Sequence, residues 1–390
     1  MKEGTTILLK IFNFLFLSLL FSLPVRSQEL FDLSDDSYNI AVLLPLTDKG
    51  QPTPDRRSFQ VLEGIKYAVH LHNKNGGEKI GLFIRDTRGD EAFLNVIKDE
   101  LMTLKNLKGI IGSTLSKDTK DLIKVFSDMG LPIVSPTATD ELLSQLSPVV
   151  IQANPTFSTR GRLAAGFAKN FHGISSVGIL YCSDGYSATL AESFKKEFEN
   201  LGGKVTYYTS YTNASLRNEQ LKTMIKGLEQ AAEKFEGLYL PVSNLMQATF
   251  LSEQLKTFKY SKYVYGNQDW LLSDAFRDPA PFLEGLFVTT DYYVDFNDPV
   301  FLQKNKEFYS FSGYLFDRTA MYGFDATNML IALLEKADFD PTAAVQAAET
   351  GFEFEGVKSK IVLDERRTNL SLSVLQNINN VFGLILKFKI

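Results

Sequence analysis

The stretch Lys108–Leu142, KGIIGSTLSKDTKDLIKVFSDMGLPIVSPTATDEL, decides the fold. It predicts a short buried strand at Gly109–Gly112, a helix, and a second strand at Pro132–Ser135. The apolar residues between the strands recur at helical spacing, and Gly130 followed by Pro132 ends that helix. A strand, a helix and a second strand in this order indicate a parallel α/β unit.

A hydroxyl-rich turn follows each of these two strands. The carboxyl ends of neighbouring parallel strands lie at one edge of the sheet, beside helix N-termini, where free backbone N–H groups favour an anion. Ser116 would also be a natural helix N-cap, so plain capping is the alternative interpretation of this composition. The polar residues that the pattern brings to the edge are Ser113, Thr114, Ser116, Thr137 and Thr139, with Ala138 between the last two.

The same local pattern occurs twice, once in each half of the chain. A strand, a helix, a Gly-Gly pair and a second strand are predicted at Asn39–Leu44, Ser58–Asn73, Gly76-Gly77 and Lys79–Asp86, and again at Ser176–Tyr181, Ser187–Leu201, Gly202-Gly203 and Lys204–Ser210. Strands that are apolar throughout are typical of parallel sheets covered on both faces. The repetition predicts two similarly wound lobes, with Asn154-Pro155 as a crossover between them.

The rest of the chain continues both lobes. The further predicted elements are helices at Asp90–Leu104, Leu216–Ala232, Asn244–Phe258, Val300–Ser310 and Thr319–Ala337, and strands at Gly237–Leu240, Tyr263–Gly266, Leu286–Thr290, Gly356–Leu363 and Ser371–Ile390. Asp364–Arg367 is predicted to be a solvated turn. Two or three crossovers between lobes would make a hinge, with a ligand site in the cleft.

The beginning of the chain has the pattern of a signal peptide. Lys2 and Lys10 precede an apolar run, Ile11–Leu23, and small or tolerated residues precede a predicted cleavage site at Ser27–Gln28. The run is shorter than the about 20 residues that a membrane-spanning helix needs. We therefore expect residues 1–27 to be a signal peptide and the mature protein to be exported and soluble.

The cysteine content and the charge of the chain indicate its cellular compartment and exclude one class of partner. The chain of 390 residues has a single cysteine, Cys182, so it offers no intrachain disulfide and no lipid-anchor cysteine after the cleavage site. A large exported chain without disulfides fits a bacterial periplasm. The formal net charge is −5, and the basic residues are dispersed among acids, which argues against a nucleic-acid surface.

The sequence predicts no catalytic or metal site and no cofactor. His70 and His72 are two residues apart on a predicted helix and therefore face apart, so surface histidines are favoured over a zinc pair. Cys182 ends a strand and is expected to be a buried structural thiol rather than a nucleophile. Phosphate-binding, dinucleotide-binding and nucleophile-elbow motifs are not found. These observations favour a binding protein over an enzyme.

Seven segments, in order and spacing, carry a resemblance to a known family: Ile40–Leu46, Ile111–Ser116, Leu131–Leu142, Val177–Tyr186, Tyr263–Asp269, Glu284–Thr290 and Gly323–Leu334. From about Tyr38 onward, the chain resembles type I periplasmic solute-binding proteins of the Leu/Ile/Val-binding (amino-acid/amide-binding) family. The resemblance implies an α/β fold of two doubly wound parallel-sheet lobes joined by a three-crossover hinge.

The resemblance also implies where the lobes divide. The first lobe is expected to comprise residues 38–151 and 292–368, and the second residues 155–290 and 369–390. The crossovers would then fall near Ile151–Thr156, Thr289–Tyr293 and Thr368–Ser371.

In amino-acid-binding members, a serine and a threonine in the first-lobe turns hold the ligand carboxylate, and a tyrosine from the second lobe closes over it. These positions correspond to Ser116, Thr137–Thr139 and Tyr186. The family's acidic ammonium ligand corresponds to Gln268, which is neutral, with Asp269 beside it. Because of this difference, an α-amino acid is in doubt as the ligand unless Asp269 binds its ammonium group.

Two further positions differ from the family pattern or adjoin the predicted cleft. Ser243 stands where members often carry a tyrosine, and it is included among the predicted ligand-binding residues. The loop Thr47–Arg57 carries Arg56 and Arg57, which are expected to be solvated unless one of them faces the cleft.

The leading functional hypothesis is a periplasmic binding protein that delivers a small polar ligand, such as an amino acid, an amide or a related carboxylate, to an ABC-type membrane permease. The alternative is a non-transport regulator or sensor of the same fold that binds a protein partner, because the IAVLLPL opening at Ile40–Leu46 is similar to that of cell-wall synthase activators.

Overall fold

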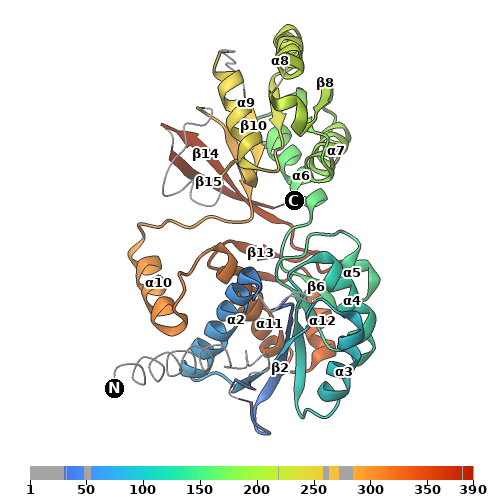
Figure 1. Cartoon of the computed structure of the whole chain (residues 1–390), viewed down its shortest axis with the longest axis vertical. Coiled ribbons are helices and arrows are strands. Elements are labelled where there is room, and N and C mark those ends of the chain that lie inside the picture. The colour runs from blue at the N-terminus through green and yellow to red at the C-terminus, as the bar shows by residue number, and fades with distance from the viewer. Residues whose placement is uncertain are drawn as a thin grey trace, which may run out of the picture.

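The computed structural model describes residues 30–31, 33–47, 54–217, 219–257, 263–271, 284–379 and 381–389. The predicted signal peptide, residues 1–27, lies outside the described residues. Within the described part, two large β-sheets are each covered by helices and lie in separate halves of the molecule (Figure 1). We refer to them as the first and second lobes.

The first lobe is built on a sheet with the order β1-β3-β2-β4-β5-β6 among the described residues. All its pairings are parallel except that of β1 with β3. Its strands are β1 (Leu30–Phe31), β2 (Tyr38–Leu44), β3 (Ile80–Asp86), β4 (Leu107–Ile111), β5 (Ile133–Ser135) and β6 (Val150–Gln152). Its helices are α2 (Arg56–Lys74), α3 (Glu91–Leu101), α4 (Ser116–Phe126), α5 (Leu143–Leu146), α10 (Pro299–Ser312), α11 (Arg318–Lys336) and α12 (Pro341–Glu349).

The second lobe has the order β15-β14-β11-β10-β9-β7-β8 in the described part of the chain. The five strands from β11 to β8 are parallel, and β14 and β15 add an antiparallel edge. Its strands are β7 (Ser176–Cys182), β8 (Lys204–Tyr211), β9 (Gly237–Leu240), β10 (Tyr263–Asn267), β11 (Phe287–Thr290), β14 (Ser371–Ile378) and β15 (Val381–Lys389). Its helices are α6 (Phe157–Gly166), α7 (Gly185–Asn200), α8 (Glu219–Ala231) and α9 (Leu245–Thr257).

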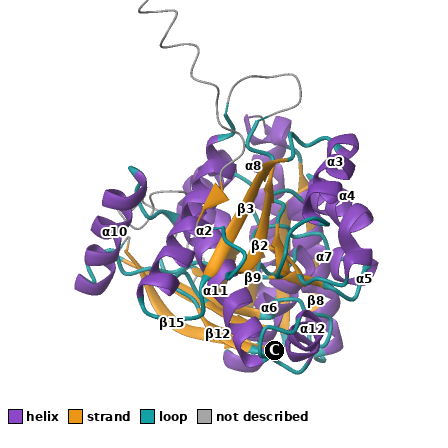
Figure 2. Ribbon diagram, turned by 90° about the horizontal axis from the view of Figure 1, so that it is seen from below, coloured by secondary structure: helices purple, strands orange, loops and turns teal. Residues whose placement is uncertain are grey.

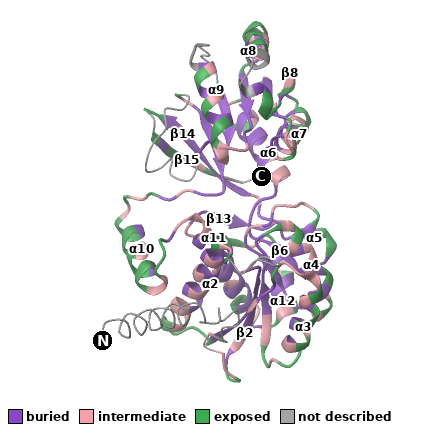
Figure 3. Ribbon diagram, viewed as in Figure 1, coloured by how far each residue is buried: buried purple, intermediate pink, exposed green. Residues whose placement is uncertain are grey.

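Each sheet separates two hydrophobic cores, as a doubly wound sheet requires. Helices flank the strands (Figure 2), and the strands are mostly buried (Figure 3). Along β2, Ile40 and Val42 pack into the core with α2 and α11, whereas Ala41 and Leu43 pack into the core with α3 and α4. The second sheet is covered by α6 and α7 on one face and by α8 and α9 on the other. Side chains of a strand alternate between faces, so an apolar run such as IAVLL supplies both cores at once.

Helices α2 and α11 cross with their backbones in close approach. A Cβ added to Gly64 would overlap the carbonyl oxygen of Ala320, and one added to Gly323 would overlap that of Val61. Two glycines therefore permit the crossing, because any side chain there would separate the helices. The crossing places the N-terminal ends of α2 and α11 side by side, where Gln60 Nε2 donates to Asp317 Oδ2 at 2.7 Å.

The segments that connect the lobes are hydrogen-bonded to one another. The first crossover follows β6, the second follows β11, and the third leads into β14. Gln152 N donates to Arg367 O at 2.9 Å, and Asn369 N donates to Gln152 O at 3.1 Å, so the first and third crossovers are paired. Tyr293 N donates to Lys358 O at 2.9 Å, which ties the second crossover to the approach to the third.

Most predicted elements are confirmed within a few residues, and several predictions need correction. The segment predicted as a strand at Ser371–Ile390 contains two paired antiparallel strands, β14 (Ser371–Ile378) and β15 (Val381–Lys389). The turn at Asp364–Arg367 is only partly solvated: Arg367 is buried, and its guanidinium donates to Val150 O and Ser144 O. Pattern analysis also missed α6, α12 and β12 (Glu353–Glu355), which pairs with β13 (Lys360–Val362). β13 lies within the predicted strand Gly356–Leu363.

Candidate functional site

A cavity of about 1000 Å³ lies between the carboxyl-terminal edges of the two sheets. Its walls are formed mainly by residues that follow β4 and β5 in the first lobe and β7, β9, β10 and β11 in the second. The N-terminal ends of α2 and α11 and the region around α10 complete it. All eight residues predicted to bind a ligand line this cavity: Ser116, Thr137, Ala138, Thr139, Tyr186, Ser243, Gln268 and Asp269. Their role in ligand binding remains a prediction.

In the first lobe, the two hydroxyl-rich turns are fastened to each other. Ser116 Oγ accepts hydrogen bonds from the backbone N–H groups of Thr139 and Asp140, both at 3.2 Å, and Thr137 Oγ1 donates to Thr114 O at 2.6 Å. The N-cap of α4 is Leu115, without a side-chain cap, so the capping interpretation of Ser116 is wrong. The first backbone N–H groups of α4 therefore remain available at the cavity wall.

The hydroxyls at this edge differ in what they can offer a ligand. The hydroxyl proton of Thr137 is committed to Thr114, whereas Ser116 accepts through its oxygen and keeps its proton. Thr139 Oγ1 has no hydrogen-bond partner among the described residues. Ser113, which the sequence placed at the same edge, is fully buried and does not line the cavity.

In the second lobe, Tyr186 and Asp269 form a linked pair. Tyr186 Oη donates to Asp269 Oδ2 at 2.6 Å, and Asn267 Nδ2 donates to the same oxygen at 2.8 Å. Burial raises the pKa of Asp269 despite the hydrogen bond from Tyr186. The Tyr186 ring packs edge-on against Phe157, with ring centroids 4.6 Å apart. Asp184 caps α7 and so fixes the helical turn that carries Tyr186.

Gln268 and Ser243 both have their side chains engaged by the protein. Gln268 Oε1 accepts a hydrogen bond from Arg160 Nη1. Ser243 Oγ donates to Asp184 Oδ2 at 2.8 Å, so its proton is committed to the residue that caps α7. Ser243 lines the cavity, and its hydroxyl stabilises the side chain that caps α7.

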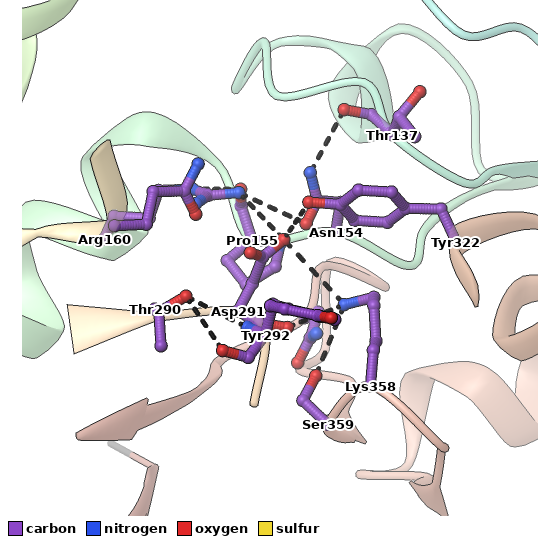
Figure 4. A network of polar contacts seen from close by, with 12 residues as sticks. Thr137, Asn154, Pro155, Arg160, Thr290, Asp291, Tyr292, Tyr322, Lys358 and Ser359 are labelled. Atoms are coloured by element: carbon purple, nitrogen blue, oxygen red, sulfur yellow. Dashed lines mark hydrogen bonds and ion pairs between the residues drawn. The ribbon is translucent and has the colours of Figure 1, made fainter. Parts of the chain in front are cut away.

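A buried charged cluster at the hinge was missed in the sequence. Asp291, on the second crossover, is fully buried and accepts hydrogen bonds from Tyr322 Oη and Arg318 Nη2, each at 2.6 Å. Arg160 Nη2 lies 3.3 Å from Asp291 Oδ2, and Lys358 Nζ donates to Asp291 O at 3.0 Å (Figure 4). The predicted crossover at Thr289–Tyr293 contained Asp291, but its partners are far away in the sequence.

The cluster sets the ionisation of its members. Burial by itself would raise the pKa of Asp291, but the guanidinium groups of Arg318 and Arg160 and the ammonium of Lys358 hold that pKa well below its usual value. Burial lowers the pKa of Lys358. Asp291 is thus a permanent anion that links the second crossover to α6 of the second lobe and to α11 of the first.

The arginines of the first loop adjoin the cavity. Arg56 and Arg57 begin α2, are exposed, and both line the cavity, whereas the sequence left open whether one of them faced it. Neither side chain has an acidic partner among the described residues. Arg160 and Arg318 also line the cavity, so its surface carries four guanidinium groups.

Other predicted features can be located too. Cys182 is buried, and burial raises the pKa of its thiol to about 11, which suits the predicted structural thiol. The described residues contain no cluster of three metal-ligating side chains. Within the same described ranges, no helix is long and apolar enough to cross a membrane.

Comparison with known proteins identifies a family and several relatives. Residues 37–371 match the family described as periplasmic binding proteins. The leucine-, isoleucine-, valine-, threonine- and alanine-binding protein of Pseudomonas aeruginosa is 22% identical over 249 residues, a match that covers 63% of this chain and 63% of that protein. The match therefore spans less than two thirds of the relative's length.

Solved structures share the fold over nearly the whole chain. A Rhodospirillum rubrum protein, classed provisionally as a branched-chain amino acid ABC transporter, has a TM-score of 0.76 at 21% identity, covering 90% of this chain and 100% of its own. The solute-binding protein of an ABC transporter from Rhodopseudomonas palustris, in complex with 3,4-dihydroxybenzoic acid, has a TM-score of 0.61 at 16% identity, covering 91% and 98%. At these identities the likeness concerns the fold.

Proposed function

Since the chain belongs to the periplasmic binding protein family, we propose that it captures a small polar ligand in the cavity between its lobes and delivers it to an ABC-type membrane permease. The observation that carries the proposal is that residues from the carboxyl edges of both sheets line one cavity. A ligand that contacts both edges favours the closed arrangement by its differential affinity for closed over open.

The proposal includes the organisation of the chain and its location. We propose lobes of residues 38–151 plus 292–368 and of residues 155–290 plus 369–390, and a cleaved signal peptide at 1–27 that directs export to the periplasm. The two sheets and the family support this arrangement. The cavity is proposed to bind without catalysing a reaction, as the name of the family implies.

The ligand edge in the first lobe is proposed to hold a carboxylate. The uncapped N-terminus of α4, the free hydroxyl of Thr139 and the proton of Ser116 converge there as donors. The ligands named for two of the relatives are leucine, isoleucine, valine, threonine and alanine for one and 3,4-dihydroxybenzoic acid for the other, and all of them carry a carboxylate. The proposed ligand class is accordingly an amino acid, an amide or a related carboxylate.

Thermal-shift screening of the mature protein, followed by small-angle scattering, tests the function. A cleft ligand should raise the melting temperature, because it binds the native state only, and should reduce the radius of gyration. A ligand that binds tightly and leaves the scattering unchanged would contradict the clamp mechanism. Capture of a periplasmic protein with no response to any small ligand would favour the regulator alternative.

A further inference from the structure

The orientation of Gln268 determines what the second-lobe end of the cavity can bind. A guanidinium group has only donors, so the atom of Gln268 that meets Arg160 Nη1 is the amide oxygen. Gln268 Nε2 is then the group left for a ligand, and it has no partner among the described residues. This position therefore offers N–H donors, which suit a carboxylate or carbonyl oxygen. The remaining lone pair of Gln268 Oε1 lies beside the Arg160 cation, which disfavours a second cation such as an ammonium group there.

Arg160 is held in place, so this orientation is built into the site. Its Nε donates to Pro155 O at 3.1 Å, and its Nη2 lies 3.2 Å from Asn154 Oδ1 and 3.3 Å from Asp291 Oδ2. The Arg160 side chain is only 4% exposed. Rotating the amide of Gln268 would bring its NH2 group against this fixed donor, which is unfavourable.

Arg318 supplies a second donor group to the same cavity. Its Nε donates to Tyr322 Oη at 3.0 Å and its Nη2 donates to Asp291 Oδ1 at 2.6 Å. Its Nη1 has no partner in the described part of the chain, and the side chain lines the cavity with 35% exposure. The guanidinium is thus preoriented, with one nitrogen left for an anion.

The charges of the lining favour anions over zwitterions. Four arginines and two aspartates line the cavity, an excess of +2, and the described lining contains no lysine, histidine or glutamate. Behind it the buried Asp291, Asp325 and Lys358 together carry −1 when all are ionised. An amino-acid zwitterion would leave the resulting excess uncompensated, whereas an anionic ligand offsets it.

Resting on the proposed solute-binding function, we propose that the ligand is a dicarboxylate without an ammonium group. One carboxylate occupies the α4 edge with Ser116 and Thr139, and the second accepts from Gln268 Nε2 and Arg318 Nη1. Asp269 adjoins the second carboxylate and is neutralised by a proton when the dianion binds, so that the added negative charges are balanced.

Calorimetry with defined probes tests the assignment. The probes are dicarboxylates of increasing length (malonate, succinate, glutarate and adipate), the corresponding monoamides, and L-leucine and L-glutamine. The proposal expects at least one dicarboxylate to bind roughly tenfold or more tightly than its monoamide and than either amino acid, as loss of a charge-assisted contact implies. An amino acid or a monoamide that binds as tightly as the best dicarboxylate would overturn the dicarboxylate assignment and leave the proposed function standing.

Two variants separate the inference from a folding defect. Gln268→Met removes the amide and adds no charge, whereas Gln268→Glu adds a carboxylate that can pair with Arg160. The proposal expects weaker dicarboxylate binding in both and a gain of amino-acid binding only in Gln268→Glu. Gln268→Met should melt below the wild type, because it leaves the buried Arg160 Nη1 without this acceptor, so cooperative unfolding of both unliganded variants is the check that they fold. Unchanged dicarboxylate affinity in both variants would overturn the role of Gln268.

Failure of the inference and failure of the proposed function give different results. Amino-acid binding accompanied by compaction in solution supports solute binding and overturns the dicarboxylate. Absence of any calorimetric or thermal response to all the probes overturns the dicarboxylate. The proposed function is overturned as well if, in addition, protein purified from its native host carries no small molecule that mass spectrometry can detect.

Discussion

Arg160 of the second lobe and Asp291 of the second crossover form a buried ion pair, with Arg160 Nη2 3.3 Å from Asp291 Oδ2. Arg160 is 4% exposed and Asp291 is fully buried. Through Arg318 and Lys358 the same carboxylate also reaches the first lobe. One anion therefore contacts both lobes and the second crossover between them.

Asp291→Asn should strongly destabilise the protein. It removes the charge that compensates three buried or half-buried cations, and breaking a buried pair in this way costs about 3–5 kcal/mol. Urea unfolding monitored by circular dichroism measures the free energy of unfolding. Asp364→Asn, in the turn before β14, serves as a control that removes a charge outside the cluster. Equal stability of Asp291→Asn and the wild type would contradict the structural role of the cluster.

The Asp291 carboxylate should make the free energy of unfolding depend on pH, and the direction of its pKa shift gives the sign of this dependence. The folded pKa of Asp291 is lowered, so its stabilising contribution is fully present above the unfolded pKa of about 3.9 and is lost as pH falls towards the folded value. The free energy of unfolding of the wild type should therefore fall steeply below about pH 4. If the free energy of unfolding of Asp291→Asn falls less steeply over the same pH range, Asp291 contributes to the pH dependence of the wild type.

Thr139→Val and Ser116→Ala should distinguish a contribution to ligand affinity from a contribution to folding stability. The Thr139 hydroxyl has no partner in the described structure, so its loss should weaken carboxylate binding with little change in stability. Loss of a donor to a charged acceptor costs about 1.5–3 kcal/mol, roughly tenfold or more in affinity. Ser116→Ala should also lower stability, because it leaves the N–H groups of Thr139 and Asp140 without an acceptor.

Calorimetry with the best-binding probe and thermal unfolding without ligand measure the two effects. Thr137→Val is the matched control, since its hydroxyl proton is already donated to Thr114 O. It should reduce stability more than affinity. Unchanged affinity in both Thr139→Val and Ser116→Ala would mean that these hydroxyls do not contact the ligand.

Binding of a dicarboxylate should take up a proton at Asp269. Burial already raises the pKa of this carboxyl, and a second carboxylate beside it would raise the pKa further. The affinity should therefore increase as pH falls from neutrality towards the raised pKa of Asp269, because the protonated form is then more populated. The titratable, charged or hydrogen-bonding groups that interact with Asp269 are Tyr186, Asn267, Arg160, Arg318, Asp291 and Tyr239.

Titrations in two buffers of different ionisation enthalpy measure the proton uptake. Asp269→Asn should bind the dicarboxylate at least as tightly as the wild type and without proton uptake. If Asp269 instead holds an ammonium group, the same substitution should abolish binding. The two outcomes distinguish a dicarboxylate from an α-amino acid.

Gly323→Ala should destabilise the protein by about 1–3 kcal/mol or more, because the new methyl group would overlap the Val61 carbonyl where α11 crosses α2. Gly185→Ala is the matched control, since a Cβ at this first residue of α7 meets open space. Thermal unfolding should show a lower melting temperature for Gly323→Ala and little change for the control. The displaced helices should also weaken ligand binding, because Arg57, Gln60 and Arg318 adjoin the cavity.

The sequence by itself determined most of the strands and helices, the two similarly wound halves and the sheet edge that lines the cavity. These features depend on local patterns: apolar runs that feed two cores, glycines that end helices, and polar turns after strands. Because parallel strands place their carboxyl ends together, those turns were sufficient to bring Ser116 and Thr139 to one edge, whereas the prediction of Tyr186 came from the family resemblance.

Only the tertiary structure decided which groups are free to act. Asp291 meets Arg160, Arg318 and Lys358 across large separations in the chain, and no periodicity encodes such a meeting. The contact between Arg160 and Gln268 Oε1 also joins residues that are distant in the sequence, and it leaves Gln268 Nε2 as a donor for a ligand. The residue type fixes which hydrogen-bond donors and acceptors a side chain has. Which of them remain available to a ligand depends on the neighbouring side chains that the crossovers bring together.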